Sequence, residues 1–207
     1  MNINYRPEID GLRAIAVISV IFYHANVVIF DEKLFKGGFI GVDIFFVISG
    51  YLITSLILRE LNTTQSFSFI NFYQRRVRRI LLPLFFVMLL CFPVAWVHLD
   101  PGNFIDFSKS ILYSIGFSSN FYFWDMGQQY AAANSLLKPF LHTWSLSIEE
   151  QYYIIFPIFL FIIFRYLRNY LLLFLIVSFI FSLLLADWGS KNYPSATFYF
   201  LHSRAWS

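Results

Sequence analysis

The chain has 207 residues, of which 58% are hydrophobic and 13% are charged, and its net charge is +3. Soluble domains are usually ~45–50% apolar and ~25% charged, and a domain of this size has too much surface to hide so large an apolar fraction. The composition therefore excludes an ordinary soluble globular domain and predicts an integral membrane protein. Cys91 is the only cysteine in the sequence, which also excludes an intrachain disulfide and a zinc site built on cysteines.

Five stretches come close to the ~20 mostly apolar residues that a spanning helix needs. In chain order they are residues 12–30, 39–58, 80–97, 146–164 and 170–186. Residues 108–124 mix Ser, Asn and Gly with aromatic residues, so we expect an interfacial or re-entrant segment there, buried in protein. The predicted fold class is all-α: a polytopic transmembrane helix bundle with about five spanning helices plus this segment.

Arginines in the short loops predict the orientation, because positively charged loops stay in the cytoplasm. The loop between the second and third segments carries five arginines: Arg59, Arg75, Arg76, Arg78 and Arg79. The loop between the fourth and fifth segments carries Arg165 and Arg168. Both loops and the N-terminus, which carries Arg6 and Arg13, are therefore expected in the cytoplasm. The sequence predicts a multi-pass protein of the cell inner membrane, made without a cleavable signal peptide.

The first segment carries two polar residues, Arg13 and His24, eleven positions apart. Eleven helical residues turn through about 1100°, close to three full turns, so the two side chains share a face about 16 Å apart. Polar residues inside a membrane are functional candidates by default, and imidazole is the usual general base near neutral pH. In the alternative interpretation, Arg13 extends to the lipid headgroups and His24 bonds a neighbouring carbonyl.

Asp43 lies a few residues inside the outer end of the second segment, in the block Gly41–Leu52. If the first two segments are antiparallel neighbours, Asp43 and His24 are at similar depth. The carboxylate could then orient the imidazole and stabilise its charged form. Alternatively, Asp43 caps the start of its helix after the turn-forming glycines.

Four arginines within five residues precede the third segment, in the block Phe72–Pro83. Such a cluster is most often a topology anchor or a contact to anionic lipid. Arg76 and Arg79, which are three residues apart, could also share a helix face and bind phosphates in bidentate fashion.

Two adjacent carboxylates, Glu149 and Glu150, open the fourth segment in the block His142–Tyr153. On a helix they point in different directions, so they do not face each other as an acid and base pair, and they also suit a helix N-terminus. Glu150 and Tyr153 share a face at three-residue spacing. The sequence has neither metal-ligand spacing nor a Gly-rich phosphate loop, so no metal is expected.

These blocks, in this order, resemble the acyltransferase 3 family of bacterial membrane O-acyltransferases. The resemblance rests on Tyr5–Ala14, the Arg13 to His24 spacing, Gly41–Leu52, the Arg76 and Arg79 pair before Pro83, and His142–Tyr153. Because the blocks span nearly the whole chain, residues 1–207 are expected to be the N-terminal portion of one such domain.

The resemblance implies transfer of an acyl group, usually acetyl, from acetyl-CoA in the cytoplasm to a sugar hydroxyl of a cell-surface polysaccharide. His24 would be the base or a transient acyl acceptor, Asp43 would orient it, and the two glutamates would shape the acceptor side. The implied catalytic residues are His24, Asp43, Glu149 and Glu150, and the implied CoA-binding residues are Arg13, Arg76 and Arg79. Acetyl-CoA is then a donor substrate, and no permanently bound cofactor is expected.

Family membrane domains have more spanning helices than this chain, and Ser207 stands where the family has a Glu after Trp206. The sequence is therefore expected to be truncated, and a partner chain could supply the missing helices. Two alternatives stay open: a proton-coupled transporter whose intramembrane His and Asp conduct protons, and an inactive remnant. The expected partners are membrane lipid, acyl-CoA and a surface glycan, with no nucleic acid.

Overall fold

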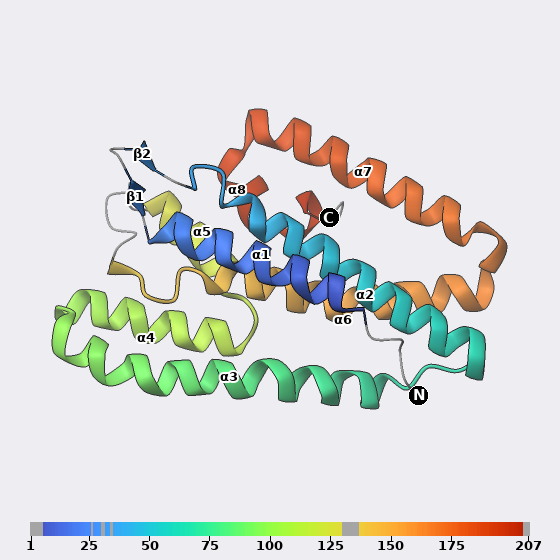
Figure 1. Ribbon diagram of the computed structural model, residues 1–207, viewed down its shortest axis with the longest axis horizontal. Helices are drawn as coiled ribbons and strands as arrows, with labels where there is room; N and C mark the ends of the chain where they lie inside the picture. The colour runs from blue at the N-terminus through green and yellow to red at the C-terminus, as the bar shows by residue number, and fades with distance from the viewer. Residues whose placement is uncertain (1–5, 26, 30–31, 34, 130–136, 205–207) are drawn as a thin grey trace. The chain divides into compact units, whose positions relative to one another are not determined.

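The structure is a computed structural model that describes residues 6–25, 27–29, 32–33, 35–129 and 137–204 (Figure 1). The chain forms two compact units, residues 1–63 and residues 64–206. Almost all of the described elements are helices, and the one described strand pair has two residues in each strand.

The first unit is a pair of helices joined by a short strand pair. Its elements are α1 (Pro7–His24), β1 (Val28–Ile29), β2 (Glu32–Lys33) and α2 (Ile40–Thr64), whose last residue falls at the boundary between the units. A Cβ built on Gly38 would lie 2.3 Å from the carbonyl oxygen of Ser19, and one built on Gly41 would lie 2.4 Å from that of Ala16. The backbones of α1 and α2 therefore touch at the start of α2, at a distance that only glycine allows.

The second unit contains the remaining helices. They are α3 (Phe69–His98), α4 (Pro101–Ile115), α5 (Ser119–Gln129), α6 (Thr143–Tyr166), the 3₁₀ helix η2 (Arg168–Tyr170), α7 (Leu171–Asn192), α8 (Pro194–Tyr199) and the 3₁₀ helix η3 (Leu201–Ser203). Polar side chains fix where two of them begin. Ser68 accepts a hydrogen bond from the backbone N–H of Asn71 at the start of α3, and Asp100 accepts one from Gly102 at the start of α4.

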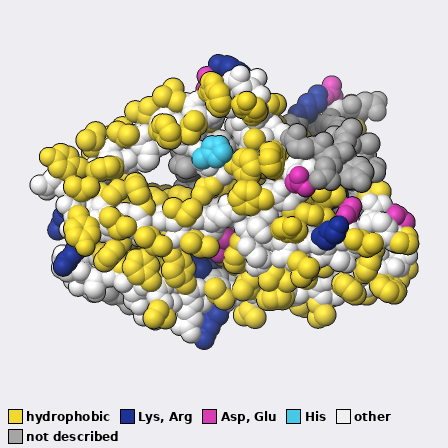
Figure 2. All heavy atoms as spheres, turned by 180° about the vertical axis from the view of Figure 1, so that it is seen from behind, with side chains coloured by type: hydrophobic (Ala, Val, Ile, Leu, Met, Phe, Trp, Pro, Cys, Tyr) yellow, Lys and Arg dark blue, Asp and Glu magenta, His cyan; other side chains and the backbone are white. Residues whose placement is uncertain are grey.

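Apolar side chains of the second unit divide between a small interior and an extensive exterior. The interior cluster joins α3, α4 and α5 and consists of Leu84, Met88, Ala95, Phe107, Phe123 and Phe140. Figure 2 shows hydrophobic side chains spread over the face of the molecule that is in view. Only 6% of the most apolar stretch of α7 is buried. A helix that is apolar all round and this exposed is suited to lipid and not to water.

Four of the described helices are long and apolar enough to cross a membrane: α2, α3, α6 and residues 168–192, which join η2 to α7. The predicted fold class, an all-α polytopic membrane bundle, is confirmed. The first predicted segment is different, because α1 carries Glu8, Asp10 and Arg13 and is not among the four. It also begins at Pro7 rather than residue 12, and ends at His24 rather than residue 30.

The prediction that Arg75 to Arg79 lie in a loop is wrong. The cap at Ser68 starts α3 well before these arginines, so all four are helical. The stretch 108–124 forms the end of α4, a turn and the start of α5, and Phe117 in that turn has a left-handed backbone with φ of 50°. Its placement relative to a bilayer stays a prediction.

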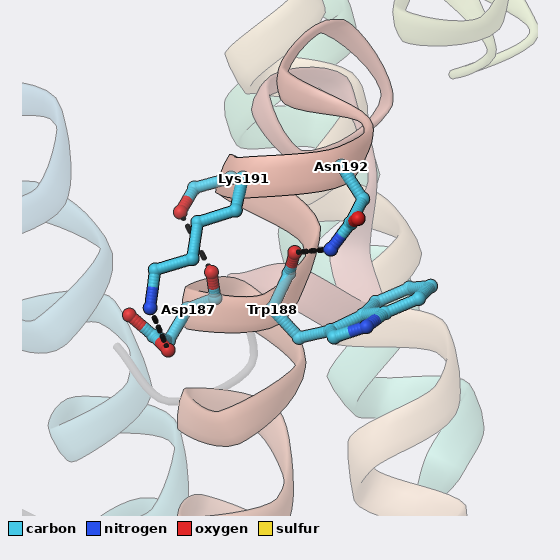
Figure 3. Close-up of polar contacts among 5 residues, drawn as sticks. Asp187, Trp188, Lys191 and Asn192 are labelled. Atoms are coloured by element: carbon cyan, nitrogen blue, oxygen red, sulfur yellow. Dashed lines mark hydrogen bonds and ion pairs between the residues drawn. The ribbon is translucent and has the colours of Figure 1, made fainter.

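The end of α7 is polar, unlike the rest of that helix (Figure 3). Lys191 Nζ lies 2.8 Å from the carboxylate of Asp187, and the Asn192 side chain donates a hydrogen bond to the carbonyl of Trp188. Trp188 itself is 56% exposed. An exposed tryptophan beside charged residues at the end of an apolar helix is typical of a membrane–water boundary.

Candidate active site

The imidazole of His24, the last residue of α1, is oriented by its own helix. Nδ1 lies 2.9 Å from the carbonyl oxygen of Val20, one turn earlier. Because a carbonyl only accepts hydrogen bonds, Nδ1 carries the proton and the basic lone pair of the neutral ring is on Nε2. The carbonyl contact that the sequence offered as an alternative therefore exists. The contact is compatible with a general base at Nε2, and that catalytic role stays a prediction.

Asp43 is half-buried in the first turn of α2. Gly41 packs between Ala16 and Val20 of α1, which sets the register of the two helices. At ~1.5 Å per residue, the backbone of Asp43 lies roughly opposite Ala16, about 12 Å along the axis from His24. The two backbones are thus offset in depth, unlike the equal depth expected from the sequence, because α1 ends sooner. The pairing of the two side chains stays a prediction.

Arg13 is half-buried and contacts an aromatic ring of the neighbouring helix. Its guanidinium carbon lies 5.0 Å from the centroid of the Phe45 ring. The ring stabilises the charge through its negatively polarised face. Arg13 and His24 lie on one continuous helix, as their spacing predicted.

A second group of predicted residues gathers in the second unit, between α3 and α6. The guanidinium carbon of Arg76 lies 4.9 Å from the centroid of the Tyr153 ring and 5.6 Å from that of Phe72. Arg76 is half-buried, whereas Arg79 is exposed. Only one member of the predicted arginine pair therefore turns into the protein.

This group lies far from the ends of α6. Tyr153 is the eleventh of the 24 residues of that helix. The hydroxyl of Tyr73 on α3 donates a 3.0 Å hydrogen bond to the carbonyl of Ile154, which holds the two helices together at this level. Arg76 is therefore inside the helix bundle, where the sequence had placed it in a cytoplasmic loop.

The two glutamates of α6 have different environments. The Tyr153 hydroxyl donates a hydrogen bond to Oε1 of Glu149, which is four residues earlier on α6. Glu150 is only 5% exposed, and its Oε1 has no hydrogen-bond partner within the described part of the chain. The charges of both glutamates act on Arg76. The structure thus brings together residues that the resemblance had assigned to the donor and acceptor sides.

A buried polar contact between α6 and the α4–α5 turn was not predicted. Ser147 Oγ lies 2.7 Å from Ser119 Oγ, and Gln151 Nε2 donates a 2.9 Å hydrogen bond to the carbonyl of Phe117. Thr143 joins the same contact by donating to Ser119 Oγ. The three residues of α6 are spaced four apart, and that spacing was the signal in the sequence, since it places them on one face.

The chain is similar in sequence to known acyltransferases. A family model described as an acyltransferase domain matches residues 6–205. The chain is 40% identical over 206 residues to the peptidoglycan O-acetyltransferase OatA of Listeria monocytogenes, an alignment that covers 97% of this chain and 32% of that protein. It is 39% identical over 155 residues to the O-acetyltransferase OatA of Staphylococcus aureus, covering 74% of this chain and 24% of that protein.

The chain thus spans a third or less of the length of these two relatives. No solved structure matches it. The family model nevertheless covers nearly every residue from the first block to the last. The chain therefore belongs to the acyltransferase 3 family.

Proposed function

We propose that this chain serves in O-acyl transfer from acyl-CoA to a sugar hydroxyl of a cell-surface polymer, at the inner membrane. Family membership and the two relatives named as O-acetyltransferases support the reaction class. The Listeria relative is named a peptidoglycan O-acetyltransferase, so peptidoglycan is the first polymer to test. The observation that carries the proposal is the group of Arg76, Tyr153, Glu149 and Glu150 between two long, mostly apolar helices, because charged residues in a membrane default to function.

In this proposal His24 Nε2 is the general base. It removes the proton of the sugar hydroxyl while the oxygen attacks the thioester carbonyl. A C–O bond forms, the C–S bond breaks, and the CoA thiolate leaves and takes the proton from the imidazolium. A positioned base of this kind contributes ~10²–10⁴-fold to a rate.

The remaining predicted residues have supporting roles in the proposal. Arg13 in the first unit and Arg79 in the second are each a candidate to bind a phosphate of acyl-CoA from the cytoplasm, which requires the N-terminus to be cytoplasmic. Asp43 stabilises the charged form of His24. Further helices, from a partner chain or from the rest of a longer protein, complete the acceptor side, and membrane lipid surrounds the apolar faces.

The test is acetylation of surface glycan in cells that lack the gene and express this chain. Ester-linked acetate is released from purified peptidoglycan by mild base and measured against cells with the empty vector. We expect acetate only in cells expressing the chain. Absence of acetate, with the protein shown to be in the membrane, would contradict the proposal, and proton-coupled solute uptake without acetyl-CoA would favour the transporter.

A further inference from the structure

One oxygen of the Glu150 carboxylate, Oε1, is a buried acceptor that the described part of the chain does not satisfy. The residue is 5% exposed, and Oε1 has no hydrogen-bond partner among the described residues. A buried acceptor left without a donor destabilises a fold by ~1–3 kcal/mol, and by more when it is charged. Such a group in a native structure requires an explanation, and one explanation is a donor that arrives with a ligand.

The neighbours of Glu150 do not provide that donor. The Tyr153 hydroxyl donates to Glu149, and the guanidinium of Arg76 lies over the face of the Tyr153 ring. Arg76 nevertheless contributes a positive charge that acts on both glutamates. The site therefore offers a cation and, close by, an unsatisfied acceptor beside a second carboxylate.

α6 is held on two sides so that Glu150 stays where it is. Toward α3, the carbonyl of Ile154 accepts the hydrogen bond from the Tyr73 hydroxyl. Toward the α4–α5 turn, Gln151 donates to the carbonyl of Phe117. Both contacts lie within about one helical turn after Glu150, so rotation of α6 to expose the carboxylate would break them.

We infer that Arg76 and Glu150 form a two-part site for the acyl donor: Arg76 binds a phosphate, and Glu150 Oε1 accepts a hydrogen bond from a neutral amide N–H of the same molecule. This inference rests on the proposed function, in which acyl-CoA is the donor. Acyl-CoA has phosphates at one end and an uncharged pantetheine arm with amide N–H groups. Among the groups of that molecule, the anionic phosphates would be repelled by Glu150, whereas an uncharged amide N–H of the arm can donate to it.

The inference moves Glu150 from the acceptor side, where the resemblance placed it, to the donor side. A sugar hydroxyl would also satisfy Glu150, but a neutral sugar has no anionic group for Arg76 to bind, whereas acyl-CoA has a group for each residue. A half-buried arginine beside the carboxylate therefore favours the acyl donor.

The test separates the two halves of the donor by binding measurements on the purified 207-residue chain in lipid nanodiscs. Four probes are used: acetyl-CoA, its two halves and an N-acetylglucosamine oligosaccharide. One half is S-acetylpantetheine, which has the arm without the nucleotide phosphates. The other half is 3′-phosphoadenosine 5′-diphosphate, which has the phosphates without the arm. Glu150→Leu should weaken binding of acetyl-CoA and of S-acetylpantetheine by ~10-fold or more. Its affinity for 3′-phosphoadenosine 5′-diphosphate should not change. Glu150→Gln, which keeps an acceptor oxygen, should restore most of the affinity.

Arg76→Gln is the reciprocal variant, and it keeps the test decisive if Glu150→Leu does not fold. This variant should bind 3′-phosphoadenosine 5′-diphosphate more weakly and should bind S-acetylpantetheine with unchanged affinity. If the native chain binds acetyl-CoA but every variant binds all probes equally, the inference is overturned while the proposed function stands. Loss of oligosaccharide binding alone in Glu150→Leu would return Glu150 to the acceptor side. A native chain that binds neither acetyl-CoA nor its fragments would overturn the proposed donor as well.

Discussion

The guanidinium of Arg76 lies 4.9 Å from the centroid of the Tyr153 ring and joins the eighth residue of α3 to the middle of α6. An arginine inside a membrane bundle is costly unless other groups stabilise its charge. Here an aromatic face and two nearby carboxylates do so. The contact places an arginine of one family block beside the glutamates of another, within one compact unit of the fold.

The stability of that contact can be measured with a double-mutant cycle on Arg76→Met and Tyr153→Leu. We expect a coupling free energy of ~0.5–2 kcal/mol, because the contact is partly shielded from solvent. The matched control is the pair Arg168 and Phe164, in which the guanidinium carbon lies 4.7 Å from the ring centroid. Because Arg168 is exposed, the coupling free energy of this pair should be smaller. Unfolding in detergent gives both values, and strictly additive effects at Arg76 and Tyr153 would contradict the contact.

Gly41→Ala should destabilise the first unit. The added Cβ would lie 2.4 Å from the carbonyl oxygen of Ala16, so α1 and α2 must separate, at a cost of ~1–3 kcal/mol. Gly11→Ala is the control, because a Cβ there has nothing within 4 Å and alanine is the better helix former by ~1 kcal/mol. The melting temperature should fall for Gly41→Ala and rise for Gly11→Ala. If it changed in the same direction for both variants, the helices would not pack as described.

Ser147→Ala should loosen the α4–α5 turn from α6. Ser147 Oγ accepts the backbone N–H of Ser119 and bonds its hydroxyl, and both serines are almost fully buried. Losing one partner of a buried pair should cost ~1–3 kcal/mol. The control is Ser178→Ala on the exposed surface of α7, where the serine hydroxyl donates to the carbonyl of Leu175 in its own helix. Equal melting temperatures for the two variants would argue against the buried contact.

Hydrophobic length predicted most of the fold because lipid requires every backbone polar group to be bonded within its own helix. Long apolar runs therefore identified α2, α3, α6 and α7. The ends were less predictable, since a helix continues past the apolar run until a cap or turn stops it. Ser68 starts α3 before its arginines, and α7 continues through its polar end to Asn192.

The sequence predicted which residues belong to the candidate site, but it did not predict which of their side chains contact one another. Sequence spacing placed Glu150 and Tyr153 on one face, yet the hydroxyl of Tyr153 bonds Glu149, which is also within one turn. Periodicity identifies which side chains are neighbours on a helix, whereas the choice among them depends on what packs opposite. Here the element that packs opposite is α3, and its Arg76 lies over the Tyr153 ring.

The central claim is that His24 is the base of an acyl transfer, and a comparison with His98 tests it most directly. His98, the last residue of α3, has the same local geometry, with Nδ1 2.9 Å from the carbonyl oxygen of Val94. The measurement is acetyl transfer from labelled acetyl-CoA to glycan in membranes containing the native chain, His24→Ala or His98→Ala. We expect the His24 variant to lose ~10²-fold or more of the rate and the His98 variant to retain the native rate. Equal rates for the two variants, at equal amounts of folded protein, would contradict the claim.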